Sequence, residues 1–299
     1  MLYILETTLT LGFVYALVSL ALFLSYRILD IADLTTDGCY VLGMAVSVTC
    51  AYYAHPILGL FLALIAGMCA GYITAFLQTR MGVPSILAGI ITNTGLYTIN
   101  LMIMGWSSNI ALLKKDTVFT LLKDAGIFGR YSNLIFIMII VFMAMLLMRW
   151  FLSTRLGLSI RATGDNREMV SASSINPRFT ITVGLSIANS LTALSGALVG
   201  QMQKSADINA GTGIVVIGLA CLIIGETVIN GKKTITRNIL AALVGNIIYR
   251  FIYAIILQTR IVPIDFLKLV TAMIVAVAIA APTLKENAYI YNRARKETK

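Results

Sequence analysis

Long runs of apolar residues separated by short polar intervals dominate this sequence. A helix needs roughly 20 mostly apolar residues to cross the hydrocarbon core of a bilayer, and several of the runs approach or reach that length. Hydrophobic residues make up 59% of the 299 positions and charged residues 12%, which is more apolar side chain than a soluble domain can cover. The chain is therefore predicted to be an all-α, polytopic membrane protein forming one transmembrane domain over residues 1–299. About nine crossings, within a range of 8–10, are predicted at 7–24, 39–53, 57–77, 83–104, 133–151, 179–199, a segment that ends at Gly225, 239–257 and 267–281.

The distribution of charge predicts the orientation of these spans. The net charge is +10, and the basic residues cluster at the ends of apolar runs and in the tail. Assigning the basic intervals to the cytoplasm follows the positive-inside bias and places the interval 153–178 and the tail 284–299 inside, with the loop 105–131 outside. Contact with inner-leaflet phospholipid explains this charge, so the bilayer is an expected partner and nucleic acid is not.

The cysteines and the histidine do not suggest a reactive or metal-binding site. Cys39, Cys50, Cys69 and Cys221 lie within apolar runs, without CxxC spacing or neighbouring histidines, and are predicted to be small buried hydrophobes. His55 precedes a proline at a predicted loop. The sequence therefore predicts no metal site, no catalytic residue and no cofactor bound by this chain.

The polar interval 153–178 is the longest inside the apolar sequence. Asp165 and Asn166 are helix-start residues, and Glu168 would lie in the first helical turn, where backbone N–H groups favour a carboxylate. A short helix of about two turns is expected to follow and to stop near Pro177. Spacing alone leaves two interpretations open, a helix that docks on another protein and a solvated basic loop that only fixes topology.

A second unusual feature is the segment 28–38, which crowds Asp30, Asp33 and Asp37 between two apolar runs. Irregular polar backbone at membrane depth is tolerated where protein or a water-filled cavity surrounds it, so the segment is either broken or re-entrant, or a plain cytoplasmic loop. Residues 32–45 resemble 206–220 once one gap is allowed, with Asp207 aligned to Asp33. Two similar glycine-interrupted segments entering from opposite faces indicate an inverted repeat with a transport pathway at its interface, and chance similarity is the alternative.

Amides and hydroxyls within the spans are candidates for lining that pathway, because polar groups at membrane depth face the bundle or a path. Asn93 and Asn100 are two helical turns apart and share a face. Hydrogen bonding between helices is the alternative role. The predicted pathway residues are Asp33, Asp37, Asn93, Asn100, Asn189, Ser190, Ser195, Asp207 and Asn246. Gly67 and Gly71 have GxxxG spacing, which lets two helix backbones approach closely.

The pattern T-R-x-G-x-x-I-R-A-x-G-x-N at 154–166 resembles the cytoplasmic loop of the permease subunits of ABC importers for branched-chain amino acids and ribose. That resemblance implies that the loop couples this chain to a separate ATPase. A Gly-Ile-Asn sequence commonly closes the family pattern, whereas this chain has Ser174 at the glycine position. The residues assigned to coupling are Arg155, Gly157, Arg161, Ala162, Gly164, Asn166, Glu168 and Met169.

The same resemblance implies that separate proteins select the solute, supply the energy and form the membrane path. The chain would be a homodimeric permease in the bacterial cytoplasmic membrane, with an external binding protein to select the solute and partner ATPases to bind ATP and Mg²⁺. Within the family, the sequence of this chain most resembles the subgroup for tryptophan, tyrosine or related solutes. An aromatic or branched-chain amino acid is therefore the predicted cargo. An ion-coupled secondary transporter and an importer of a sugar or nucleoside are the alternatives.

Overall fold

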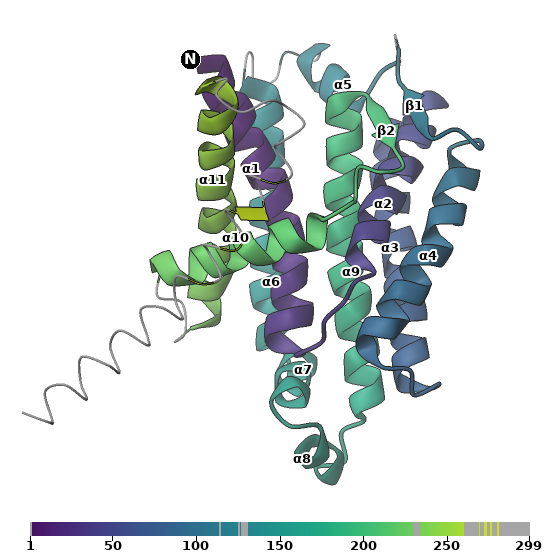
Figure 1. Ribbon diagram of the computed structural model, residues 1–299, viewed down its shortest axis with the longest axis vertical. Helices are drawn as coiled ribbons and strands as arrows, with labels where there is room; N and C mark the ends of the chain where they lie inside the picture. The colour runs from purple at the N-terminus through teal and green to yellow at the C-terminus, as the bar shows by residue number, and fades with distance from the viewer. Residues whose placement is uncertain are drawn as a thin grey trace, which may run out of the picture.

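The computed structural model describes residues 2–113, 115–124, 126, 131–229 and 234–259, with isolated positions at 269, 272, 273, 276 and 280. Long helices run roughly parallel in a bundle (Figure 1). They are α1 (Leu2–Leu22, extended by the π-helical turn η1, Phe23–Ile28), α3 (Pro56–Thr79), α4 (Ser85–Ile103), α6 (Ser132–Ser153), α9 (Pro177–Gln203) and α11 (Ile235–Thr259). Shorter elements are α2 (Thr36–Tyr52), α5 (Val118–Asp124), α7 (Arg155–Asp165), α8 (Arg167–Ala172), α10 (Ile214–Ile229) and the strands β1 (Asn109–Ala111) and β2 (Ser205–Asp207).

Within the described residues, six helices are long and apolar enough to cross a membrane. The prediction of about nine crossings is therefore not confirmed. The helix α2 begins in the middle of the bundle, and α10 crosses α1 at a steep angle to the long helices (Figure 1). Both are shorter than the roughly 20 residues that a full crossing needs. Most of the predicted span 267–281, the tail 284–299 and part of the loop 105–131 lie outside the described residues.

The ends of the bundle carry different elements. The strands β1 and β2 pair as an antiparallel two-stranded sheet at one end, next to α5, and α7 and α8 lie at the other end (Figure 1). We call these the sheet end and the α8 end. The chain approaches α2 from the α8 end and α10 from the sheet end, so the two interrupted helices are entered from opposite directions.

Helix packing follows a repeated pattern. Helix α9 packs against both α2 and α3, and α1 packs against both α10 and α11, while α2 contacts α3 and α10 contacts α11. Equivalent turns precede the two short helices. The N–H of Thr35 donates to Asp33 Oδ1 at 2.9 Å, and the N–H of Asn209 donates to Asp207 Oδ1 at 2.7 Å. The two segments aligned by sequence therefore share a local hydrogen bond and a packing environment.

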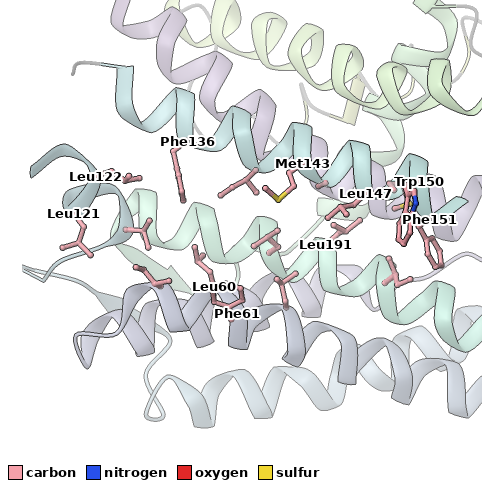
Figure 2. Close-up of a pocket in the computed structure, with 18 residues that line it drawn as sticks. Leu60, Phe61, Leu121, Leu122, Phe136, Met143, Leu147, Trp150, Phe151 and Leu191 are labelled. Atoms are coloured by element: carbon pink, nitrogen blue, oxygen red, sulfur yellow. The ribbon is translucent and has the colours of Figure 1, made fainter. Parts of the chain in front are cut away.

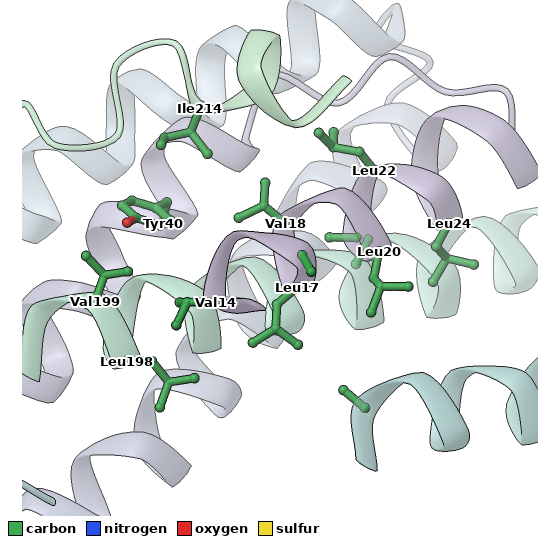
Figure 3. Packing of buried hydrophobic residues seen from close by; sticks show 14 of the residues in the cluster. Val14, Leu17, Val18, Leu20, Leu22, Leu24, Tyr40, Leu198, Val199 and Ile214 are labelled. Atoms are coloured by element: carbon green, nitrogen blue, oxygen red, sulfur yellow. The ribbon is translucent and has the colours of Figure 1, made fainter. Parts of the chain in front are cut away.

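The core lies along α1 and α9. In each of these two helices, 78% of the most apolar 18-residue stretch is buried, whereas the corresponding share is 22% in α6 and 28% in α4. Figure 3 shows the apolar side chains of α1 packed between α9, α2 and α10. The GxxxG prediction is confirmed, because a Cβ on Gly67 or Gly71 of α3 would collide with the backbone of α9. These contacts hold the interrupted helices in the centre of the bundle.

Candidate functional site

The N-termini of α2 and α10 meet at the side chain of Asp37. This residue lies in the first turn of α2, and its carboxylate accepts hydrogen bonds from the N–H groups of Gly213 (3.0 Å) and Val215 (2.9 Å) at the start of α10. Helix N-termini carry partial positive charge and free N–H groups. One carboxylate thus serves two helix ends and fixes α10 to α2.

A polar cavity of about 340 Å³ opens beside this junction. Among its walls are Asp37, Asn93 and Asn100, so the structure brings together three of the predicted pathway residues from α2 and α4. The Nδ2 of Asn100 donates to the carbonyl of Gly38 at 3.2 Å, while its buried Oδ1 has no partner in the described part of the chain. Neutral amides around a single engaged carboxylate can pass a polar solute without holding it strongly.

Several residues that line this cavity were not predicted from the sequence. Tyr97 lies one turn from both Asn93 and Asn100 on α4, so the same helical periodicity would have found it. Asn209 and Thr212 come from the loop before α10. Asn209 aligns with Thr35 in the first repeat copy, and extending the repeat comparison to hydrogen-bonding residues would have identified it.

The predicted residues Asp33 and Asn189 do not line the cavity. Asn189 Nδ2 donates to Asp33 Oδ2 at 2.6 Å, and both side chains are buried, at 0% and 3% exposure. This pair ties the irregular segment before α2 to α9, 156 residues away in sequence. The contact joins a non-helical segment to a helix, and a part for either side chain in a pathway stays a prediction.

The remaining predicted pathway residues also take part in local or interhelical bonds. Ser195 donates to the carbonyl of Val14 at 2.9 Å, and Asn246 Nδ2 donates to Ser19 Oγ at 2.7 Å, which links α9 and α11 to α1. Ser190 donates to a carbonyl of its own helix, and Asp207 forms the turn described above. Their part in a pathway stays a prediction.

A cavity of about 740 Å³ lies between α3, α5, α6 and α9 (Figure 2). Its walls are leucine, isoleucine, phenylalanine, methionine and similar side chains, of which Phe61, Phe136 and Met143 are labelled in the figure. Polar solutes lose their hydration in such a space without gaining a hydrogen bond. The larger cavity is therefore the poorer candidate for a polar path.

The interval 153–178 contains two helices, whereas the sequence predicted one. Asn166 caps α8 by accepting from the N–H of Met169 at 3.0 Å, and Glu168 lies in the first turn, which confirms the predicted helix. The additional helix, α7, is capped by Thr154, whose Oγ1 accepts from the N–H of Gly157. The buried face of α7 is formed by Gly157, Ile160 and Thr163, whose three-residue spacing was the signal for this helix.

The coupling residues named from the sequence divide into three groups by their packing and exposure. Gly157 and Gly164 face the bundle, and a Cβ on Gly164 would collide with the carbonyl of Ile28 at the end of η1. Arg161 and Ala162 are half-buried. Four residues are exposed and available to another protein, namely Arg155, Asn166, Glu168 and Met169. Met169 is a large apolar side chain at 56% exposure on α8.

Ser174 replaces the glycine of the family pattern and adopts φ +60°. This left-handed conformation favours glycine and costs a residue with a Cβ roughly 1 kcal/mol. The turn geometry is thus retained at Ser174 without the glycine, between α8 and the start of α9.

Interrupted helices that meet beside a polar cavity, enclosed by long apolar helices, are typical of membrane transport proteins. Residues 4–280 match the model of the family described as "Branched-chain amino acid transport system / permease component". The chain belongs to this family of ABC transporter permeases, and it is a multi-pass membrane protein and a transport component.

Similar proteins come from several bacteria. The chain is 32% identical to the tyrosine transport system permease protein of Clostridioides difficile over 93% of this chain and 91% of that protein. It is 35% identical to an uncharacterized protein of Rickettsia prowazekii, over 88% and 91% of the two chains. It is 27% identical to the ribose import permease protein of Escherichia coli, over 71% and 62%. No solved structure was found to match the chain.

Proposed function

We propose that this permease moves a small polar solute inward through the cavity beside Asp37, with an aromatic or branched-chain amino acid as the cargo. The single observation that carries the proposal is the meeting of two interrupted helices next to a cavity lined by Asn93, Asn100 and Tyr97. The similarity to a tyrosine permease favours an amino acid. The similarity to a ribose permease makes a sugar the second candidate.

Energy would come from partner ATPases that bind ATP and Mg²⁺ and contact the α8 end. The exposed residues Glu168 and Met169 on a capped, surface helix support this docking. The α8 end would then be cytoplasmic, together with the C-terminus, in the bacterial cytoplasmic membrane. Two copies of the permease would pair so that each contributes its cavity to one pathway. The packing pattern supports an inverted repeat of α1 to α3 and α9 to α11.

An external binding protein would dock at the sheet end and act on the cavity through β2. The N–H of Leu112 donates to the carbonyl of Lys204 at 2.7 Å, and the N–H of Ile208 donates to that of Ser108 at 3.0 Å. Ile208 and Asn209 also line the polar cavity. A displacement of the loop before β1 would therefore reach the cavity wall within a few residues.

The test is uptake by proteoliposomes that contain the permease, its ATPase and its binding protein. We expect accumulation of a labelled amino acid that requires ATP and the binding protein. The paired reversal Arg161→Glu with Glu168→Arg should abolish stimulated ATP hydrolysis and leave binding-protein docking intact. The matched control, Lys123→Asp with Asp124→Lys, reverses an exposed pair on α5 at the sheet end and should leave assembly with the ATPase unchanged.

Uphill uptake by the permease alone, driven by an ion gradient, would identify a secondary transporter and reject the proposal. Accumulation of ribose in preference to amino acids would reject the cargo and keep the mechanism.

A further inference from the structure

A polar cavity of about 450 Å³ lies at the α8 end, between the end of α3, the start of α4, the helix α8 and the start of α9. It is separate from the pathway cavity beside Asp37 and shares no wall with it. Its walls include Arg167 and Ser171, which lie one turn apart on α8, and Arg178 on the first turn of α9. A ligand in this space would therefore touch the proposed coupling helix and the bundle at once.

Several hydrogen-bond donors around this cavity have no partner among the described residues. Arg167 and Arg178 supply two guanidinium groups, and no described wall residue is an aspartate or glutamate. Gln78 Nε2 is buried and has no hydrogen-bond partner within the described residues. The helix α4 begins here after Pro84, which makes no side-chain capping bond, so its first-turn N–H groups are unsatisfied by a cap. Arginine pairs, free amide donors and helix N-termini select anions, phosphates above all.

The protein surface next to the cavity is apolar enough to contact lipid acyl chains. Large apolar side chains on α3, on α4 and in the turn between them remain exposed, namely Phe76 at 44%, Met81 at 65%, Ile86 at 54% and Leu87 at 48%. If the long helices span the bilayer as proposed, the cavity lies at the level of the inner-leaflet headgroups. Basic pockets between helices on this side bind anionic headgroups.

We infer that the cavity is a binding site for the phosphate of an anionic phospholipid, whose acyl chains lie along the exposed apolar face of α3 and α4. This inference rests on the membrane orientation in the proposed function. The bound phosphate joins Arg167 on α8 to Arg178 and Gln78 on the bundle. Anionic lipid then stiffens the connection between the coupling helix and the spans.

The experiment measures lipid retained by the purified permease, without its partners, so it gives a result whether or not transport is reconstituted. Native mass spectrometry would count phosphatidylglycerol and phosphatidylcholine molecules that remain bound after detergent exchange. We expect selective retention of phosphatidylglycerol, and a loss of about tenfold in its affinity in Arg178→Gln and in Gln78→Leu, as for one lost charge-assisted contact. Arg149→Gln is the matched control, because Arg149 is an exposed arginine near the same end of the bundle outside this cavity.

Melting temperatures without added lipid establish that each variant folds. Equal retention of both lipids, or equal affinity in Arg178→Gln and Arg149→Gln, overturns the site. Stabilisation by millimolar inorganic phosphate equal to that by phosphatidylglycerol overturns the lipid and identifies a small phosphate ligand. Weaker ATPase binding by Arg178→Gln with unchanged lipid retention identifies an acidic ATPase side chain as the occupant and also overturns the proposal.

Discussion

Replacing Asp37 tests whether this carboxylate is a structural clamp between α2 and α10. Asp37→Ala removes both acceptors of the hydrogen bonds from Gly213 and Val215. Hydrogen bonds to a charged group contribute about 1.5–3 kcal/mol each, so the change should destabilise the fold by roughly 3–6 kcal/mol. Asp37→Asn keeps one acceptor oxygen and should cost about half as much.

The assay is thermal unfolding of the detergent-solubilised permease. With about 2 °C per kcal/mol for a chain of this size, Asp37→Ala should melt roughly 6–12 °C below the wild type. Asp207→Ala is the matched control, because Asp207 accepts a single exposed bond within its own turn, and it should melt within about 2 °C of the wild type.

The alternative role for Asp37 is direct contact with the solute. In that case Asp37→Ala would lose uptake and keep the wild-type melting temperature, and the clamp would be refuted. Equal destabilisation by Asp37→Ala and Asp207→Ala would also contradict the reasoning, because the two carboxylates differ in how many helix ends they serve.

Three further results are expected. Ala111→Cys with Ser205→Cys places two thiols at a non-hydrogen-bonded pair of β1 and β2, where Cα atoms are about 4.5 Å apart. Oxidation should leave uptake unchanged, because the proposed displacement moves the two strands together, and a loss of uptake that reduction restores would show that the strands must separate. Asn189→Leu removes the donor to the buried Oδ2 of Asp33, while Oδ1 still accepts from the N–H of Thr35, and should cost about 2–4 kcal/mol in denaturant unfolding. Additive effects with Asp33→Leu would show that the two side chains are uncoupled. Ser174→Gly should raise stability by up to about 1 kcal/mol, and a lower melting temperature would mean that the left-handed turn is absent.

Helix positions could be predicted from this sequence because hydropathy is a local property. The predicted span 83–104 corresponds to α4, Ser85–Ile103, and the span 239–257 lies within α11, Ile235–Thr259. The predicted crossings at α2 and α10 are not confirmed, since an apolar helix that starts inside the bundle has the same composition as one that starts at the surface. What distinguishes them is the packing around their N-termini, which composition does not report.

The partners of polar side chains could not be predicted. In the sequence, the basic residue that follows Glu226 most closely is Lys232. The carboxylate of Glu226 instead lies 3.2 Å from the guanidinium of Arg27 at the end of η1, while Lys232 is outside the described residues. Asn246 likewise bonds Ser19, 227 residues away. Sequence identifies groups that need partners, and the fold decides which partners they meet.

The two segments of the proposed internal repeat also differ where symmetry would be costly. Asp33 and Asp207 form the same turn in each copy, but Asp37 has no carboxylate counterpart, since the aligned positions hold Gly211 and Thr212. At the point where two helix N-termini meet, one carboxylate already accepts from α10 while lying in the first turn of α2. A second would bring an unpaired charge within a few ångströms of the first, at membrane depth, where like charges are least screened. Sharing one carboxylate between two helix ends therefore makes the centre of the proposed repeat asymmetric. The segment without the carboxylate, before α10, lines the cavity with the neutral side chains of Asn209 and Thr212.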